Sequence, residues 1–160
     1  MLSIKLICVG KLKEKYFADA CAEYIKRLSA FCKLEIDEVA ESALRNAPSD
    51  SEIELALEKE ACVIETKLPK GAHVIAMCVE GRRFSSEDIA ELFTKSTIGG
   101  ISKLCFIIGG SFGLAERIKS KADAKMSMSE MTFPHHLARV MLLEQIYRGF
   151  KINEGGRYHK

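Results

Sequence analysis

The stretch LCFIIGGSFG, residues 104–113, decides the fold class of this chain. Its first five residues are uniformly apolar, which is typical of a strand buried on both faces of a parallel sheet. Glycines follow at once, and they let a ligand approach the backbone because glycine has no Cβ and accepts positive φ. The spacing matches neither G-x-G-x-x-G nor a P-loop. Two interpretations therefore stay equally open, a tight strand-to-helix turn and a ligand site at the carboxyl end of a strand.

Strand and helix patterns alternate on both sides of this stretch. Apolar, β-branched runs predict further strands at 2–9, 33–39, 73–79 and 124–128. Apolar residues at helical spacing predict helices at 14–28, 50–67, 86–96, 114–120 and 135–148. Glu80 and Gly81 predict a turn after the strand at 73–79, and Ser49 with Glu52 predicts a capping box. This alternation predicts an α/β fold with a mostly parallel sheet flanked by helices.

Length and composition predict one soluble globular domain, residues 1–160. Of the 160 residues, 48% are hydrophobic and 29% are charged, which excludes wholesale disorder. No apolar run approaches the ~20 residues that cross a bilayer, so we expect no membrane association. The opening MLSIKLICVGK is typical of a strand and not of a signal peptide. We therefore expect a cytoplasmic protein.

The charge is unevenly distributed along the chain. Residues 35–65 contain ten acids and two bases, whereas the remaining 22 basic and 12 acidic residues give the rest of the chain a charge of +10. Such asymmetry permits a polyanionic partner on one face. On charge alone we favour the simpler interpretation, an acidic solvated helix with scattered lysines elsewhere.

Cysteine and histidine spacings do not predict a metal site. The six cysteines form no C-x-x-C pair, and we expect reduced thiols, with Cys8, Cys78 and Cys105 packed in apolar strands. His135 and His136 are neighbours at a helix start, where Thr132 would cap and Pro134 would enter the first turn. For the two histidines we favour cap or surface roles over metal binding.

The last helix and the tail each allow two interpretations. Apolar residues cover well over half of the circumference of HLARVMLLEQIYRGF, residues 136–150, so this helix must be covered on both sides. We favour a homodimer interface over a core helix covered within one chain. The tail, residues 149–160, places a cation, an aromatic ring and an imidazole after Gly155–Gly156. Composition alone favours a frayed terminus over a nucleic-acid contact.

The motifs together resemble one family. FIIGGSFGL, then SMSEMTFPHHLARVMLLEQIYRGFKI, then a terminal YHK are similar to the ribosomal RNA large-subunit methyltransferase H family of the SPOUT class. The opening VGKLKEKYFADACAEYIKRL is also similar, so the resemblance covers essentially the whole chain. Arg157 stands where many members have Pro.

The resemblance implies a fold and a reaction. It implies a homodimeric α/β protein with a C-terminal trefoil knot, a feature otherwise nearly absent from folds. It also implies methylation of N3 of a pseudouridine in 23S rRNA within the assembled 70S ribosome, with S-adenosylmethionine as methyl donor. A related SPOUT enzyme acting on transfer RNA is the alternative. A non-catalytic module that binds a ligand at residues 109–113 is another.

The resemblance also implies site residues. The cofactor would lie against Met77, Gly109, Gly110, Met128, Ser129, Glu130, Met131, Thr132 and Phe133. The N3–H of the base must lose its proton before the nitrogen attacks, and His159 and Tyr158 are the candidates for this step, acting from their own chain or from the partner. Arg157 would stabilise the developing anion. RNA phosphates would meet Arg148, Lys151, Arg157 and Lys160, and no metal is implied.

Overall fold

The computed structural model describes residues 1–159, without the side chain of residue 159. Five strands form one sheet in the order β2-β1-β4-β3-β5, and every pair of neighbours is parallel. The strands are β1 (Leu2–Val9), β2 (Cys32–Val39), β3 (His73–Arg83), β4 (Lys103–Ile108) and β5 (Ala124–Ser127). The predicted α/β fold with a parallel sheet is confirmed. The trefoil knot stays a prediction, because strand order and pairing do not define how the chain is threaded.

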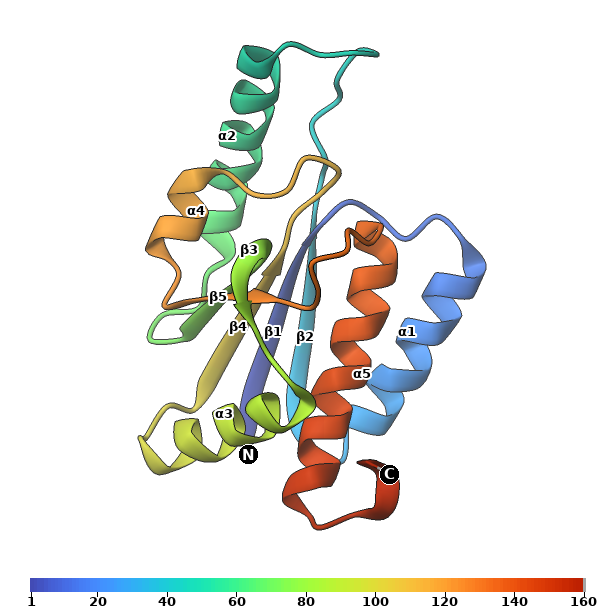
Figure 1. Cartoon of the computed structure of the whole chain (residues 1–160), viewed down its shortest axis with the longest axis vertical. Helices are drawn as coiled ribbons and strands as arrows, with labels where there is room; N and C mark the ends of the chain where they lie inside the picture. Colours follow the sequence, from blue (N-terminus) through green and yellow to red (C-terminus); the bar gives the residue numbers. More distant parts are fainter. Residues whose placement is uncertain (160) are drawn as a thin grey trace.

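Helices cover both faces of the sheet (Figure 1). They are α1 (Lys15–Leu28), α2 (Asp50–Lys67), α3 (Ser86–Ile98), α4 (Glu116–Lys121) and α5 (His135–Asn153), and a short 3-10 turn, η1 (Arg157–His159), follows α5. Buried side chains of α1, α3 and α5 pack on one face, and those of α2 and α4 pack on the other. The molecule is thus a three-layer sandwich, and the sheet carries core on both sides.

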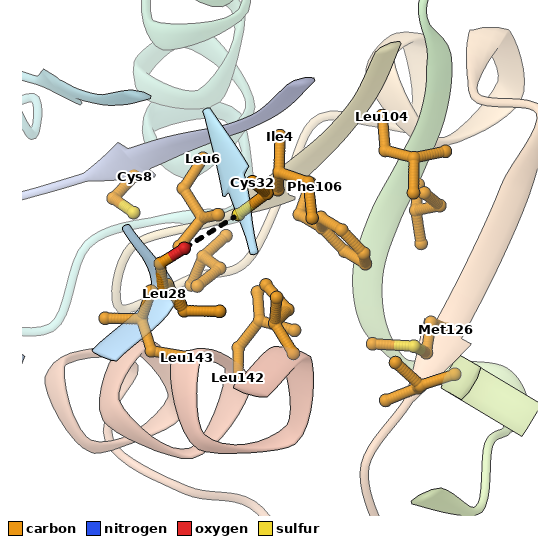
Figure 2. Close-up of a cluster of buried hydrophobic side chains, with 14 of the residues drawn as sticks. Ile4, Leu6, Cys8, Leu28, Cys32, Leu104, Phe106, Met126, Leu142 and Leu143 are labelled. Carbon is orange, nitrogen blue, oxygen red and sulfur yellow. Dashed lines mark hydrogen bonds between the residues drawn. The ribbon is translucent and has the colours of Figure 1, made fainter. Parts of the chain in front are cut away.

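The burial of the central strand β4 explains why residues 104–113 decide the fold class. Every residue from Leu104 to Ile108 is buried. Successive side chains point to opposite faces, so Phe106 joins the α1–α3–α5 cluster, whereas Cys105 and Ile107 join the α2–α4 cluster. Figure 2 shows the first cluster, in which Leu142 and Leu143 of α5 lie with Leu28, Leu6 and Phe106. The prediction of a strand buried on both faces is confirmed.

The predicted turn at Glu80–Gly81 is wrong, because β3 continues to Arg83. Met77 and Arg82 both pair with Met126 of β5, so the four residues between them form a bulge. A Cβ on Gly81 would lie 2.7 Å from the backbone carbon of Lys125. Glycine is needed here for a close strand approach, and not for a chain reversal.

The ends of two helices were predicted with different success. The capping box of Ser49 and Glu52 is confirmed, with both reciprocal hydrogen bonds present. At the start of α5, however, Pro134 is itself the N-cap residue and no side chain caps the helix, so the predicted Thr132 cap is wrong. The same helix runs on to Asn153, five residues beyond its predicted end.

The acidic segment is only partly solvated. Glu58 of α2 accepts hydrogen bonds from Arg117 of α4, and Glu65 forms ion pairs with Arg117 and Lys121. Glu60 is buried, and this burial raises the pKa of its carboxyl group. The prediction of a plainly solvated acidic helix is therefore wrong for the face that packs on α4, although exposed pairs of this kind stabilise little.

The apolar circumference of α5 is partly covered within a single chain. The helix lies between α1 and α3 and against the sheet (Figure 1). Every residue from His135 to Ile152 is at least partly buried. The core-helix interpretation thus accounts for part of the pattern, and the homodimer interface stays a prediction. None of the helices in residues 1–159 is long and apolar enough to span a membrane.

Thiol chemistry gives a direct test of the two-sided core. Cys8 and Cys105 are buried, and burial raises the pKa of each to about 12. At pH 8 each thiol then has only ~10⁻⁴ of its population as the reactive thiolate, and the surrounding core also blocks the reagent. We expect iodoacetamide to modify the exposed Cys62 first in the native protein, and Cys8 and Cys105 only after denaturation. Mass spectrometry of timed digests measures this, and native labelling of Cys105 as fast as that of Cys62 would contradict the packing.

Candidate functional site

A cavity of about 780 Å³ opens at the carboxyl ends of β3, β4 and β5. In parallel sheets this edge is where ligands bind, and the volume suits a molecule of nucleoside size. Three segments surround it, namely the bulge of β3, the loop 109–114, and the loop 128–134 with the start of α5. The lining residues are Met77, Cys78, Val79, Glu80, Ile108, Gly109, Gly110, Ser111, Phe112, Gly113, Leu114, Lys119, Met126, Ser127, Met128, Ser129, Met131, Thr132, Phe133, Pro134, His135 and Ala138.

The glycine loop 109–113 folds back on itself at one wall. The Gly113 N–H donates to the Gly110 carbonyl at 3.0 Å, and Gly113 has a φ of 79°. A Cβ on Gly109 would lie 2.3 Å from the Gly113 carbonyl oxygen, closer than real Cβ atoms come to other atoms. The turn and the cavity wall are therefore the same structure. The two interpretations of these glycines are compatible.

The loop after β5 forms the opposite wall and is held by its own serines. The Ser127 hydroxyl donates to the Ser129 carbonyl at 2.9 Å, and the Ser129 hydroxyl accepts from the Met131 N–H at 3.0 Å. Glu130 is exposed and lies 3.5 Å from Arg83, outside the cavity lining. The wall facing the cavity thus combines methionine and phenylalanine side chains with backbone polar groups.

An ion pair lies on the third wall, formed by the bulge of β3. The Lys119 ammonium is 2.5 Å from Glu80 and 2.9 Å from Glu116. Burial opposes the charge on Lys119, but hydrogen bonds to the two carboxylates hold its pKa above the ordinary value. The partner Glu80 has a lowered pKa, chiefly because of the hydrogen bond from Lys119. Both groups stay charged at neutral pH, and they give the cavity one polar corner.

The two histidines at the start of α5 are mostly buried, so the predicted surface role is wrong. The side chain of His135 is 17% exposed and lies 3.9 Å from Glu41, and His136 lies 3.9 Å from Glu14. Burial and the neighbouring His136 lower the pKa of His135, so it is neutral near pH 7. Within residues 1–159, three or more His, Cys, Asp or Glu side chains nowhere converge as a metal site would require.

Most of the predicted cofactor residues meet at this cavity. Eight of the nine line it, and Glu130 does not. Sequence reasoning missed Glu80, Lys119 and His135. His135 could have been predicted as a lining residue, because it follows the predicted cofactor loop at 128–133 in the sequence. No such signal existed for the pair of Glu80 and Lys119, because 39 residues separate them and only the bulge of β3 brings them together.

The cavity fits S-adenosylmethionine in its chemistry. Apolar side chains on two walls suit an adenine ring, and the glycine loop lets backbone groups reach the ribose and the amino-acid part. The Cβ position of Gly109 is occupied by backbone atoms of Gly113, so the backbone itself forms this wall of the cavity. The fully charged corner at Lys119 and Glu80 suits a zwitterionic end of such a molecule.

The predicted catalytic tail lies far from the cavity of its own chain. Tyr158 packs at the end of α5, where its hydroxyl donates to Glu144 at 3.3 Å and its ring lies 5.0 Å from that of Tyr147. The cavity takes residues from the start of α5, including Ala138. A helix rises about 1.5 Å per residue, so Ala138 and Arg148 are about 15 Å apart along its axis. In Figure 1 the turn that follows α5 lies at the opposite end of this helix from the β5–α5 loop.

The predicted RNA contacts are divided by the structure. Arg148 is engaged within the chain, since it pairs with Glu144 at 2.8 Å and donates to the Tyr158 carbonyl at 3.1 Å. Lys151 pairs with Glu154 at 2.8 Å, whereas Arg157 is exposed. Lys160 and the side chain of His159 lie outside the described residues. Of these four cations, Arg157 is the described one that faces solvent.

A second cavity lies on the other side of the β5 loop. Its volume is about 410 Å³, and it shares Met126, Ser127 and Met128 with the first. Tyr24, Glu144 and Gln145 also line it, and the Ser86 hydroxyl donates to Gln145 at 2.6 Å. Glu144 therefore links this cavity to the tail through Tyr158.

Comparison with known proteins agrees with the fold and the motifs. The family described as predicted SPOUT methyltransferase matches residues 2–159. Relatives named ribosomal RNA large subunit methyltransferase H are 48% identical in Streptococcus uberis and 44% in Bacillus pumilus, each over 99% of this chain and 100% of the relative. The solved structure of a probable methylase family protein from Haemophilus influenzae shares the fold, with a TM-score of 0.57 and 12% identity over 100% of this chain and 72% of that chain. The chain thus belongs to the ribosomal RNA large subunit methyltransferase H family of SPOUT methyltransferases.

Proposed function

We propose that the protein transfers a methyl group from S-adenosylmethionine to N3 of a pseudouridine in 23S rRNA of the assembled ribosome. Family membership makes it a ribosomal RNA methyltransferase. The observation that carries the cofactor assignment is the convergence of eight predicted residues on one cavity at the carboxyl ends of the strands. The chain acts as one domain over residues 1–160, in the cytoplasm.

Cofactor binding follows from the three walls. Met77, Met128 and Phe133 hold the adenine between apolar surfaces, while the loop at Gly109 presents backbone groups to the ribose. When bound, the cofactor supplies an electrophilic methyl carbon on a sulfonium. The task of this chain is to hold that carbon about 3–3.5 Å from the attacking nitrogen and in line with it.

The tail supplies proton transfer and anion stabilisation, and it does so to the partner's cavity in a homodimer. The packing of Tyr158 at the far end of α5 supports this arrangement over action in the tail's own cavity, and the second cavity, lined by the Glu144 that Tyr158 contacts, is where we place the contact with the second copy. Burial raises the pKa of Tyr158, with Tyr24 and Glu144 adding to the shift. Its phenol therefore acts as a hydrogen-bond donor, and His159 takes the N3 proton.

Binding to RNA is assigned to the basic tail. Arg157 is exposed and free to approach a phosphate or the developing N3 anion, and Lys160 extends the same run of cations. Arg148 holds the tail through its hydrogen bond to the Tyr158 carbonyl, and the Lys151 carbonyl holds it through the hydrogen bond from the Gly156 N–H. Because the tail has so few cations to neutralise phosphates, we favour a composite ribosomal surface over naked RNA as the substrate.

The test is a methylation assay with labelled S-adenosylmethionine and four acceptors, namely 70S ribosomes from a strain that lacks the enzyme, 50S subunits, naked 23S rRNA and bulk transfer RNA. We expect methylation of intact ribosomes, little of naked 23S rRNA, and a single modified pseudouridine on mapping by mass spectrometry. Transfer to transfer RNA and not to ribosomes would replace the proposal with the transfer-RNA alternative. Calorimetry that shows no binding of S-adenosylmethionine would refute the cofactor assignment.

A further inference from the structure

Glu41 connects the two walls of the cavity, although it lies 70 residues from one of them. Its Oε1 atom accepts a hydrogen bond from the Ser111 N–H at 2.8 Å, in the glycine loop. Its Oε2 atom lies 3.9 Å from Nε2 of His135, at the start of α5. One side chain thus bridges the loop 109–113 and the helix that carries the opposite wall.

The second glycine of the loop is explained by this carboxylate. A Cβ on Gly110 would lie 2.7 Å from Oε1 of Glu41 and 3.1 Å from the side chain of Val9. Glycine at position 110 therefore makes room for Glu41, so the carboxylate can lie directly on the loop backbone. This hydrogen bond from Ser111 to a carboxylate adds to the internal turn bond in fixing the position of the loop.

Glu41 is itself held by the neighbouring residue. The Ser42 N–H donates to Oε2 of Glu60 at 2.9 Å, and the Ser42 hydroxyl donates to the Ala56 carbonyl at 3.2 Å. Glu60 is only 5% exposed, and burying a carboxyl group is costly unless it is hydrogen-bonded, as this one is by the Ser42 N–H. The tether therefore connects α2 to the segment that carries Glu41, and it limits the movement of that segment.

His135 completes the bridge. Its Nε2 atom is buried and has no hydrogen-bond partner among the described residues. The carboxylate of Glu41 lies 3.9 Å from it, and a Cβ on Gly10 would lie 3.0 Å from the same nitrogen. The imidazole thus packs between the β1–α1 turn and Glu41, and the start of α5 contacts the same carboxylate that holds the glycine loop.

We infer that Glu41 is a positioning residue that holds the glycine loop in the shape that accepts S-adenosylmethionine. The inference rests on the proposed function, since it assumes that the cavity takes this cofactor. A loop held in its bound shape loses little freedom when the ligand arrives, so the hydrogen bond to Ser111 contributes to affinity without touching the ligand. The side chain is 33% exposed, so its removal leaves the core intact.

The test compares Glu41→Ala, Glu41→Gln and a matched control, Glu52→Ala. Glu52 also accepts a hydrogen bond from a backbone N–H, that of Ser49, but in the capping box of α2 and outside the cavity lining. Calorimetry with S-adenosylmethionine and thermal melts are measured for each. We expect Glu41→Ala to raise the Kd about tenfold, and Glu41→Gln to recover most of the loss because an amide oxygen still accepts from Ser111. Glu52→Ala should lower the melting temperature by at least as much with an unchanged Kd.

Kinetics give a second readout. In ribosome methylation, Glu41→Ala should raise the KM for S-adenosylmethionine and leave kcat at saturation close to wild type, because the residue acts only on binding. Wild-type affinity in Glu41→Ala, or an equal loss in Glu52→Ala, overturns the inference while the proposed function stands. If the wild-type protein binds no S-adenosylmethionine, the proposed function fails and the inference fails with it.

Discussion

A chain that ends at Gly156 should bind S-adenosylmethionine normally and methylate ribosomes about 10²–10⁴-fold more slowly than the full chain, the range that a positioned acid or base contributes. The truncation removes Arg157, Tyr158 and the two residues after them, and the tail is placed at the far end of α5 from the cavity. Single-turnover methylation of 70S ribosomes measures the rate, and calorimetry measures cofactor affinity.

Two variants separate chemistry from packing in this experiment. Tyr158→Phe keeps the ring contact with Tyr147 and removes only the hydroxyl that donates to Glu144, so it reports the contribution of that donor. His159→Gln removes the proposed proton acceptor. If the truncated chain methylates ribosomes at the normal rate, the tail has no catalytic role. If only His159→Gln is slow, the acceptor is assigned and Tyr158 is structural.

Mixed dimers test whether the tail serves its partner. A truncated chain has an intact cavity, and a Gly109→Ala chain has an intact tail. When the tail acts in the partner's cavity, each mixed dimer contains one complete site, and random mixing of two inactive chains should restore roughly a quarter of wild-type activity. When the tail acts in its own chain, mixing restores nothing. Sedimentation of the wild-type protein as a monomer would also refute the shared site.

The local patterns predicted the layers of the fold but not its irregularities. Uniformly apolar residues at 104–108 predicted a doubly buried strand because burial on both faces leaves no room for alternation. The end of β3 could not be predicted, since Glu80 and Gly81 are turn residues and only the backbone of Lys125 makes the glycine necessary. Gly149 likewise resembled a helix end, but it sits inside α5, where its missing Cβ admits Phe93 and Ile89.

The lining of the cavity was predicted where its residues are close in sequence. The loop at 128–133 and the glycines at 109–110 are continuous motifs, and the resemblance placed both at the cofactor. Long-range pairs such as Glu41 with Ser111 carry no local signal, because a single glutamate in a polar loop is ordinary until the fold brings it to the glycine loop. The position of the tail also depends on the length of α5. Gly149 suggested that this helix ends at Arg148, whereas it continues to Asn153.

Gly109→Ala should abolish detectable binding of S-adenosylmethionine, a loss of at least about 100-fold, because the loop must open to accept the new methyl group. The Cβ would lie 2.3 Å from the Gly113 carbonyl oxygen and 2.5 Å from its carbon, and both are backbone atoms that no rotamer change can move. Separating them breaks the turn bond from Gly113 to Gly110 and displaces the wall that we propose contacts the cofactor. A backbone shift of about 1 Å at a binding site is enough for a loss of this size.

The matched control is Gly100→Ala, which separates backbone strain from the loss of the wall. Gly100 has a φ of 76° but nothing within 4 Å of its Cβ position, so alanine there costs about 1 kcal/mol of strain in a turn outside the cavity lining. We expect Gly100→Ala to lower stability and keep full cofactor affinity, while Gly109→Ala loses affinity yet stays folded by circular dichroism. Normal binding by Gly109→Ala would mean that the cofactor lies elsewhere, because the loop shape on which the cavity depends cannot survive that substitution.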